Sequence, residues 1–342
     1  MKVLVLATSP KTRGGISSVL NCYRKQPFWE EFGCRWISTH RDGSKLRKLA
    51  YLLGAWAQFI CLLPFYDIVH IHLGLRPSML RKYPFFLLSR ALGKKIVVHL
   101  HCGSQLDSIW NRKYSRVITS ANRALVLSES IRKDVLSLIG EEYSDKVTVL
   151  YNPAGQSPAS FEGRKDRILF AGLLIPEKGC FDLIEAFAQL AGRFPGWRLV
   201  LAGDGMKDKC RALAEQLGVG ALTDLPGWVD TDEMSRLYSE AAIFCLPSYA
   251  EGLPMSILEA WSNGLPVVCT PVGAVPEVAE DGRNAVFVTP GDTAELALRL
   301  SSLMGDRTLR NNMGARSLVS AQTMFSPAAI CRQLAEIYNN LS

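Results

Sequence analysis

Residues 246–260 have the sequence LPSYAEGLPMSILEA. They begin at the end of the short apolar run Ile243–Leu246, which predicts a buried strand, and continue into a helical pattern whose first turn suits Pro254. Gly252 and Leu253 come directly before that turn, where backbone amides and the helix dipole favour an anion such as a diphosphate. The stretch therefore predicts a strand, a loop and a helix start that together form an anion-binding site.

Two carboxylates, Glu251 and Glu259, are eight residues apart around this predicted helix start. If the whole stretch were helical, they would be separated by up to about 12 Å along the axis and about 80° around it. Carboxylates beside an anion site can accept hydrogen bonds from two sets of hydroxyl groups, which a sugar and a ribose on the two ends of a diphosphate would supply. A surface pair explains either residue alone, but explains poorly why both lie beside this helix start.

On both sides of this stretch, short apolar runs alternate with longer helical patterns. Runs that are apolar on both faces indicate parallel strands covered by helices, and such sheets bind ligands at the carboxyl ends of their strands. The polar stretch Asn152–Arg164 separates two such alternations, so we expect an α/β chain of two Rossmann-like, doubly wound domains facing across a cleft. A final helix is expected over Ala328–Leu341. The expected strands are Val3–Ala7, Ile68–Leu73, Ile96–His101, Ala124–Leu127, Val147–Leu150, Arg167–Ala171, Arg198–Ala202, Ile243–Leu246 and Pro266–Thr270.

Charge is divided unevenly along the 342 residues, although the net charge is only +7. Residues 1–155 hold 23 Lys and Arg against 10 Asp and Glu, whereas residues 156–342 hold 16 against 22. The basic half suits an anionic partner, which is a membrane surface, a phosphorylated substrate or nucleic acid. The apolar fraction of 48% excludes a disordered or fibrous chain. Nine cysteines without a CxxC pair argue against a disulfide framework or zinc module and fit a reducing cytosol.

Two segments of the basic half bear on membranes. Met1–Ala7 is too short for a signal-peptide core and is expected to be a buried first strand. Leu49–Tyr66 has 18 residues without a charge, which approaches the length of a membrane span, but Gln58 and Pro64 interrupt it. A buried or interfacial helix is the preferred interpretation, with a span as the alternative. Basic residues interleaved with aromatics over residues 76–95 are typical of a lipid-facing surface, and equally of a solvated helix face.

Glycines and one lysine follow predicted strands in both domains. Gly14 and Gly15 precede the first helix, and Gly172 and Gly203 end two strands of the second domain. Backbone without a Cβ can approach a ligand closely. Lys178 follows in the loop after Gly172 and can neutralise phosphate oxygens. Taken singly, a tight turn or an exposed lysine explains each of these residues equally well.

Four of the five histidines form two H-x-H pairs, His70/His72 and His99/His101, each at the end of a predicted strand. Residues i and i+2 share a strand face, so a metal site is geometrically feasible, and a metal-dependent hydrolase is one alternative function. Neither pair has an acidic neighbour, so packing is preferred and no metal is expected. Asp230-Thr231-Asp232 precedes a helical pattern and is expected to cap it rather than to bind a metal.

The Glu251–Glu259 stretch resembles the E-x7-E motif of the family 4 retaining glycosyltransferases, the group 1 type of bacterial surface-polysaccharide biosynthesis, whose fold is GT-B. The resemblance covers nearly the whole chain. It implies an acceptor-binding domain over residues 1–155, a nucleotide-sugar-binding domain over 156–325, and a C-terminal helix, 326–342, that crosses back to the first domain. The other motifs in the family's order and approximate spacing are Phe170–Gly179, Gly203–Gly205, Gly264–Val268 and Gly273–Glu277.

The same resemblance implies roles for individual residues. Glu251 and His101 would contact the donor sugar, Lys178 would hold the diphosphate, and Glu259 would bind the ribose. Leu173 stands where the family usually has an Arg that helps to hold phosphate, which leaves open a weakly active enzyme or a binding protein that has lost catalysis. The other expected donor-binding residues are Gly14, Gly15, Gly172, Gly203, Gly252, Leu253 and Pro254, with Trp228 and Val229 near the base.

These implications together predict a retaining, metal-independent hexosyltransferase that uses no cofactor. Its co-substrate would be a nucleotide diphosphate sugar, UDP-linked rather than GDP-linked, and its acceptor an undecaprenyl-diphosphate-linked glycan. The implied location is the cytoplasm, at the anionic inner face of the cytoplasmic membrane, in the assembly of O-antigen, capsule or exopolysaccharide. Nucleic acid is not expected as a partner, since it would account for the basic half only. A nucleotide-sugar 2-epimerase of the same fold is the second alternative function.

Overall fold

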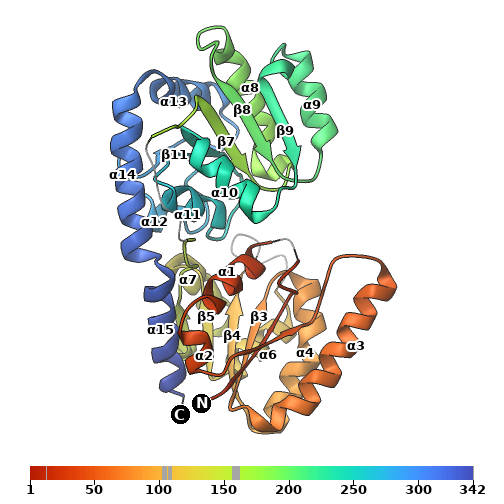
Figure 1. The fold of residues 1–342 in the computed structure, drawn as a ribbon. Coiled ribbons are helices and arrows are strands. Elements are labelled where there is room, and N and C mark those ends of the chain that lie inside the picture. The colour runs from red at the N-terminus through yellow and green to blue at the C-terminus, as the bar shows by residue number, and fades with distance from the viewer. Residues whose placement is uncertain (13, 102–105, 107–109, 156–161, 342) are drawn as a thin grey trace. The chain divides into compact units, whose positions relative to one another are not determined.

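The computed structural model describes residues 1–12, 14–101, 106, 110–155 and 162–341, which form two compact units. The first unit comprises Met1–Pro153 and Pro327–Ser342, and the second comprises Ala154–Ser326. Each unit has its own parallel sheet with helices packed on it (Figure 1). Both units are therefore Rossmann-like, which confirms the expected α/β fold class.

The first unit alternates strands and helices along the chain. Its elements are β1 (Val3–Ala7), α1 (Gly15–Arg24), α2 (Phe28–Glu31), β2 (Arg35–Ser38), α3 (Lys45–Leu62), η1 (Leu63–Phe65), β3 (Ile68–Leu73), α4 (Arg76–Ala91), β4 (Lys95–Leu100), α6 (Arg112–Ser120), β5 (Arg123–Val126), α7 (Glu129–Ile139), η2 (Glu141–Lys146), β6 (Val147–Val149) and α15 (Pro327–Asn339). The strand order is β2-β1-β3-β4-β5-β6, so the direction of winding reverses after β2. Right-handed crossovers then put the helices before and after this reversal on opposite faces of the sheet.

The two helix layers of the first unit are held by aromatic contacts. On one face, Tyr338 of α15 packs against Phe28 and Phe32 beside α1 and α2, with ring centroids 5.6 and 5.3 Å away. On the other face, Trp56 of α3 stacks on Phe85 of α4 at 4.1 Å. The last helix of the chain is thus part of the core of the first unit.

The second unit repeats the alternation. Its elements are β7 (Arg167–Ala171), η3 (Pro176–Lys178), α8 (Cys180–Ala191), β8 (Arg198–Ala202), α9 (Lys207–Gln216), η4 (Gly220–Leu222), β9 (Thr223–Gly227), α10 (Thr231–Glu240), β10 (Ile243–Leu246), α11 (Met255–Ser262), β11 (Val267–Cys269), α12 (Val275–Val278), β12 (Val286–Phe287), α13 (Thr293–Gly305) and α14 (Arg307–Met324). The strand order is β12-β11-β10-β7-β8-β9. Winding therefore reverses between β7 and β10, which are neighbours in the sheet.

All nine expected strands are present, with ends that differ from the prediction by at most one residue. Every residue of β1 and β3 is buried, as expected for strands covered on both faces. The sheets also contain β2, β9 and β12, which were not expected. All three lie at sheet edges, where a strand can be short, partly exposed or, in β9, interrupted by Pro226.

Candidate active site

Lys178 and Glu251 form an ion pair beyond the carboxyl ends of the second sheet. Lys178 ends the η3 turn after β7, Glu251 lies in the loop after β10, and Lys178 Nζ is 2.6 Å from Glu251 Oε1. The two strands flank the point where the strand order reverses, and doubly wound sheets bind ligands beside the carboxyl ends at this point. The pair therefore lies where this topology forms a ligand site.

Glu251 is held in place by the loops around it. It is buried, with 8% of the residue exposed, and it accepts a hydrogen bond from Ser248 Oγ at 2.7 Å. Gly179 follows Lys178 with a φ of 68°, and a Cβ at this position would overlap the carbonyl oxygen of Pro247. Only glycine therefore allows the loop after β7 to come this close to the loop after β10.

Gly252, Leu253 and Pro254 lead directly from Glu251 into α11. Pro254 is extended and immediately precedes the first helical residue, Met255. The N–H groups of a first helical turn have no acceptor within the helix and carry the positive end of its dipole. Together with Lys178, the start of α11 gives this loop two sources of positive charge.

Glu259 lies inside α11 and has a different environment from Glu251. It is half-buried, and Tyr238 of α10 donates a hydrogen bond to its Oε2 at 3.0 Å. Burial raises the pKa of Glu259 to about 7, while the bond from Tyr238 acts in the opposite direction. A small change in its surroundings can therefore change the charge of this carboxyl group near neutral pH.

The glycines at the ends of β7 and β8 pack against each other. Gly203 has a φ of 155°, and a Cβ there would overlap the carbonyl oxygen of Gly172. Close contact between two chain segments thus explains this glycine, and donor binding by the two residues stays a prediction. After β9, Trp228 is half exposed, and its backbone N–H donates to Asp204 Oδ1 at 3.2 Å. Val229 is half-buried.

Leu173 offers no cation where the family usually has an Arg. It follows Gly172 directly after β7, and 56% of the residue is exposed. The same loop supplies Lys178, so one lysine stands where the resemblance implies a lysine and an arginine. This position is open for substitution because the Leu173 side chain faces solvent.

The Asp230-Thr231-Asp232 segment begins α10. Asp230 Oδ1 accepts a hydrogen bond from Glu233 N at 2.9 Å, which satisfies one of the amides at the helix start. The expected capping role of this segment is therefore confirmed.

In the first unit, the glycine loop and the histidines lie at the carboxyl ends of strands. Gly14 and Gly15 are exposed at the start of α1, and Gly14 has a φ of 136°. Arg13, beside them, lies outside the described residues, as do Cys102, Gly103 and Ser104. His101 is half-buried and directly follows β4.

The structure brings His70, His72 and His99 together, so that their candidate ligand atoms lie within 4.8 Å of one another. All three are buried, and desolvation lowers the pKa of each imidazole. His72 Nδ1 and His101 Nε2 are joined by a hydrogen bond of 2.8 Å. The H-x-H alternation correctly indicated a shared face, whereas the contact between the two strands depends on their register.

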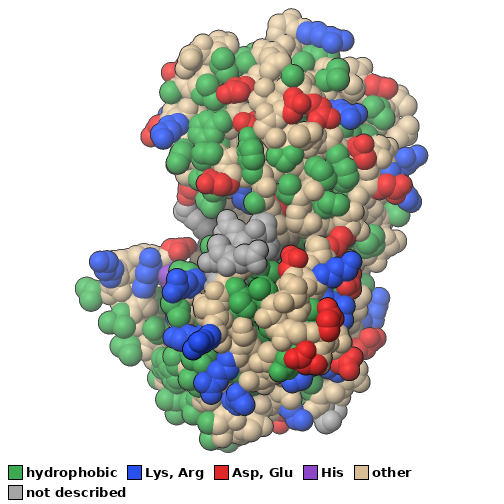
Figure 2. All heavy atoms as spheres, turned by 180° about the vertical axis from the view of Figure 1, so that it is seen from behind, with side chains coloured by type: hydrophobic (Ala, Val, Ile, Leu, Met, Phe, Trp, Pro, Cys, Tyr) green, Lys and Arg blue, Asp and Glu red, His purple; other side chains and the backbone are tan. Residues whose placement is uncertain are grey.

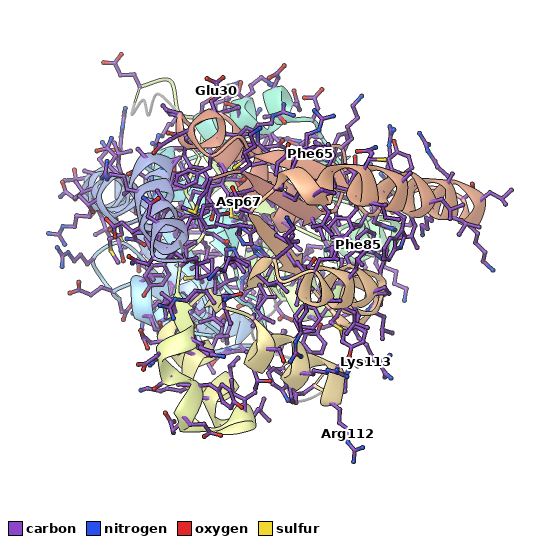
Figure 3. All side chains as sticks on the ribbon, turned by 90° about the horizontal axis from the view of Figure 1, so that it is seen from below. Glu30, Phe65, Asp67, Phe85, Arg112 and Lys113 are labelled. Atoms are coloured by element: carbon purple, nitrogen blue, oxygen red, sulfur yellow. The ribbon has the colours of Figure 1, made fainter. Side chains whose placement is uncertain are left out.

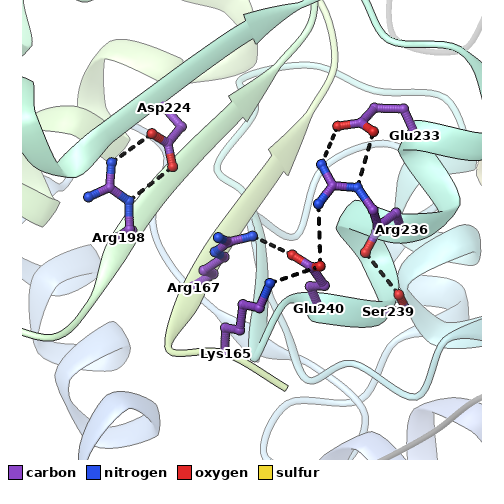
Figure 4. Close-up of polar contacts among 8 residues, drawn as sticks. All are labelled: Lys165, Arg167, Arg198, Asp224, Glu233, Arg236, Ser239 and Glu240. Atoms are coloured by element: carbon purple, nitrogen blue, oxygen red, sulfur yellow. Dashed lines mark hydrogen bonds and ion pairs between the residues drawn. The ribbon is translucent and has the colours of Figure 1, made fainter. Parts of the chain in front are cut away.

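A cavity of about 480 Å³ in the second unit lies elsewhere, among β9, α9 and α10. Three of its lining residues are Arg167, Arg211 and Arg236. Figure 4 shows that Arg167 and Arg236 both pair with Glu240, at 2.5 and 3.3 Å. The network stabilises the unit, and the cavity lies beside Arg167, the first residue of β7, away from the carboxyl ends of the strands where this topology forms a ligand site.

Helix α3 exposes an apolar surface on the first unit. By length and composition alone, residues Lys45–Phe65 could cross a membrane. Only 17% of their most apolar 18-residue stretch is buried in the structure. Trp56 and Phe59 of α3 contact Phe85 of α4, and Figure 3 shows Phe85 beside α3. Figure 2 shows hydrophobic side chains gathered with Lys and Arg on the same unit. The exposed large apolar residues of α3 and η1 are Leu46, Leu49, Leu53, Ile60 and Phe65.

Sequence reasoning did not identify the direct partners of the predicted residues. Ser248 bonds to Glu251, Tyr238 bonds to Glu259, and His72 bonds to His101. Ser248 lies three residues before Glu251 in the same loop, which is a usable signal. No local spacing points to Tyr238, because it comes from a separate helix.

Residues 156–318 match the family model of glycosyl transferases group 1. One relative is the lipopolysaccharide core biosynthesis glycosyltransferase LpsE of Rhizobium meliloti, 32% identical over 164 residues that cover 48% of this chain and 46% of LpsE. Another is the alpha-D-kanosaminyltransferase of Streptomyces kanamyceticus, 26% identical over 286 residues, 76% of this chain and 74% of that protein. For eight curated relatives, the chain spans 20% to 74% of the relative's own length, and less than two thirds in all but one.

Among solved structures, the chain is similar to HepE of Anabaena, which has been crystallised with UDP and with UDP-glucose. The TM-score is 0.78 at 20% identity, over 99% of this chain and 100% of HepE in the UDP complex. Two doubly wound units of this kind define the GT-B class of folds. Within that class, residues 156–318 are the part of this chain that is similar to the glycosyl transferases group 1 family.

Proposed function

We propose that this protein transfers a hexose-type sugar from a nucleotide diphosphate sugar to a hydroxyl group, with the donor held by the second unit. The observation that carries the proposal is the Lys178–Glu251 pair at the reversal point of the sheet, beside the start of α11. Lys178 and the helix amides would hold the diphosphate, Glu251 the sugar and Glu259 the ribose. The UDP and UDP-glucose complexes of HepE support a uridine nucleotide rather than a guanosine nucleotide.

The reaction we propose retains the configuration at the anomeric carbon. Positive charge from Lys178 and α11 would stabilise the diphosphate as its bond to the anomeric carbon breaks. The acceptor oxygen would bond to that carbon on the same face, and its proton would pass to the departing phosphate oxygen. Glu251 is engaged by Lys178 and Ser248, which suits hydrogen bonding to the sugar better than covalent attack. This scheme requires no metal and no cofactor.

The acceptor we propose is a lipid-linked glycan of polysaccharide assembly, with undecaprenyl diphosphate as the expected carrier, reached at the anionic inner face of the cytoplasmic membrane. Residues 1–155 carry a net charge of +13, and α3 exposes leucines along its length. Trp56 and Phe59 anchor α3 to α4, which supports a helix lying in the interface rather than one that crosses the membrane.

The test is incubation of the purified protein with UDP-hexoses and GDP-hexoses, with and without a lipid-linked glycan extract. We expect label to pass to the lipid only with a UDP-sugar and acceptor, and NMR of the product to give the anomeric configuration of the donor. An epimerised nucleotide sugar formed without acceptor would indicate the 2-epimerase instead. Failure of every donor to react or bind would contradict the proposal.

A further inference from the structure

Four histidine side chains form a stacked group at the carboxyl ends of β3 and β4. His70 and His72 share a face of β3, and His99 and His101 continue the same alternation along and beyond β4. Ring centroids are 4.2 Å apart for His70 and His72, and 4.1 Å apart for His99 and His101. His72 pairs with His99 in the strand register, and His101 N donates to Leu73 O at 2.8 Å. The backbone of both strands therefore fixes the group.

Within this group, His72 is the side chain that holds His101. His72 Nδ1 lies 2.8 Å from His101 Nε2, and the other ring nitrogen of His72 is buried with no partner among the described residues. The backbone of His72 is fixed as well, because Lys82 Nζ donates to its carbonyl oxygen and to Ser78 Oγ. His101 is the half-buried member of the group, so it is the one accessible to a ligand.

Burial keeps both imidazoles neutral. Desolvation lowers the pKa of His72 and of His101 well below the usual value, and the neighbouring His70, His99 and Lys82 lower both further. Tyr338 faces the group from α15 through His70 Nδ1, and it adds no charge because burial raises the pKa of its hydroxyl. Each neutral ring carries one proton, so a single hydrogen lies between His72 and His101.

The surroundings decide which ring donates that hydrogen. If His72 Nδ1–H donates, His72 Nε2 is a bare acceptor and His101 carries its proton on Nδ1. In the reverse arrangement, His72 Nε2–H would be a buried donor without an acceptor among the described residues, which native proteins rarely contain. Neutral His99 already brings one buried, unpaired N–H into the same group. The contacts favour donation by His72.

We propose that His72 is a positioning residue for His101: it fixes the imidazole ring and keeps its proton on Nδ1, so that His101 presents an N–H donor to an oxygen of the bound sugar. This inference rests on the proposed function, together with the contact between His101 and the donor sugar that the family resemblance implies. A donor held in a fixed direction needs no reorganisation during the reaction. His72 itself does not contact the substrate in this account.

The same group fits a metal less well. A metal lies in the plane of each imidazole that binds it, whereas the rings of His70 and His99 are stacked with an interplanar angle of only 9°. His70 Nδ1 is also engaged by the Tyr338 hydroxyl at 2.6 Å. Metal binding is therefore an outcome of the test below rather than a second proposal.

The protonation test uses full-length protein labelled with ¹⁵N-histidine and two-bond ¹H–¹⁵N spectra, with the His101 signals assigned by their loss in His101→Gln. We expect His101 to be protonated on Nδ1 in the wild type and in His72→Asn, whose amide nitrogen can replace Nδ1 as donor. His72→Leu should shift His101 to a mixture of the two tautomers. Protonation of wild-type His101 on Nε2 would overturn the proposal even if His72→Leu failed to fold.

The kinetic test separates positioning from a purely structural role. His72→Leu should lower kcat about tenfold and change the KM for the donor by less than about threefold, and His72→Asn should recover most of the loss. The matched control is His70→Leu, on the same strand and face, which should keep kcat near the wild-type value. Equal losses in the two leucine variants, or stoichiometric zinc in the purified protein, would overturn the proposal. If the wild type transferred no sugar, the proposed function would fail, while the spectra would still decide the His72–His101 arrangement.

Discussion

The two units of the chain are both doubly wound parallel sheets, with different strand orders, and they carry different chemistry at the carboxyl ends of their strands. Beyond the carboxyl ends of the second sheet, Lys178 and Glu251 form a charged pair 2.6 Å apart. At the carboxyl ends of the first sheet, His72 and His101 form a neutral pair 2.8 Å apart. Yet residues 1–155 carry a net charge of +13, and residues 156–342 a net charge of −6.

This contrast teaches that the net charge of a unit does not indicate the charge of its site. The acidic half places a cation and a helix start at the reversal point, which suits a diphosphate. The basic half places uncharged imidazoles at the carboxyl ends of its central strands β3 and β4, which suits hydroxyl groups. In the function we propose, the surface charge of this half faces an anionic membrane. The four predictions below test this division of roles.

The largest effect is expected from Lys178→Met, which removes the cation and leaves a side chain of similar length. We expect kcat/KM for sugar transfer to fall about 10³-fold, because the charge on the departing diphosphate loses its partner. Lys165→Met is the matched control, since Lys165 pairs with Glu240 at 2.9 Å in the ion-pair network of the same unit. A loss below about tenfold, or an equal loss in the control, would place the diphosphate elsewhere.

The double variant Leu49→Asp/Leu53→Asp tests the surface of the basic half. Both leucines are more than half exposed on α3, and the change should weaken binding to phosphatidylglycerol-containing vesicles about 30-fold in co-sedimentation. Transfer to a water-soluble acceptor should be unchanged. Leu298→Asp, at a 65% exposed leucine of the second unit, should bind vesicles as the wild type does. If the double variant bound vesicles as well as Leu298→Asp does, α3 would not be the membrane-binding surface.

The pH dependence of nucleotide affinity tests Glu259. Its pKa is raised to about 7, and an ionised carboxylate accepts hydrogen bonds from ribose hydroxyls better than the protonated acid does. Affinity for UDP should therefore be greatest above pH 7 and fall about tenfold as the pH drops from 8 to 5.5. Calorimetry of Glu259→Gln should give a weaker affinity with little pH dependence. The same slope in the variant would mean that another group titrates.

The smallest effect is expected from Leu173→Arg, which restores the cation found in the family. The exposed side chain can be replaced without disturbing the core, and the added charge should tighten donor binding about fivefold. Leu173→Gln controls for size and polarity. Unchanged affinity in the Arg variant, measured at low and moderate salt, would show that this position does not face the diphosphate.

The central strands could be predicted from sequence because they are continuous apolar runs. β1, β3, β7, β8 and β10 match the prediction without any shift. β2, β9 and β12 could not be predicted, since edge strands do not need to be apolar on both faces and β12 has only two residues. Sequence-based prediction of the strands therefore fails at the sheet edges, whereas the candidate site lies beside the central strands β7 and β10.

For the candidate site, the sequence indicated the individual residues but not which of them are in contact. The strand–loop–helix pattern and the resemblance indicated both Lys178 and Glu251, yet 73 positions separate them, and only the order of β7 and β10 brings them into contact. The raised pKa of Glu259 could likewise not be predicted from the sequence, because it results from burial in the folded protein.

The most direct test of the central claim is calorimetric titration of the wild type and Lys178→Met with UDP and with GDP. We predict saturable one-to-one binding of UDP to the wild type, tighter than that of GDP, and at least tenfold weaker binding of UDP to the variant. Absence of binding by either nucleotide, or equal affinity of the variant for UDP, would contradict a donor site at the Lys178–Glu251 pair.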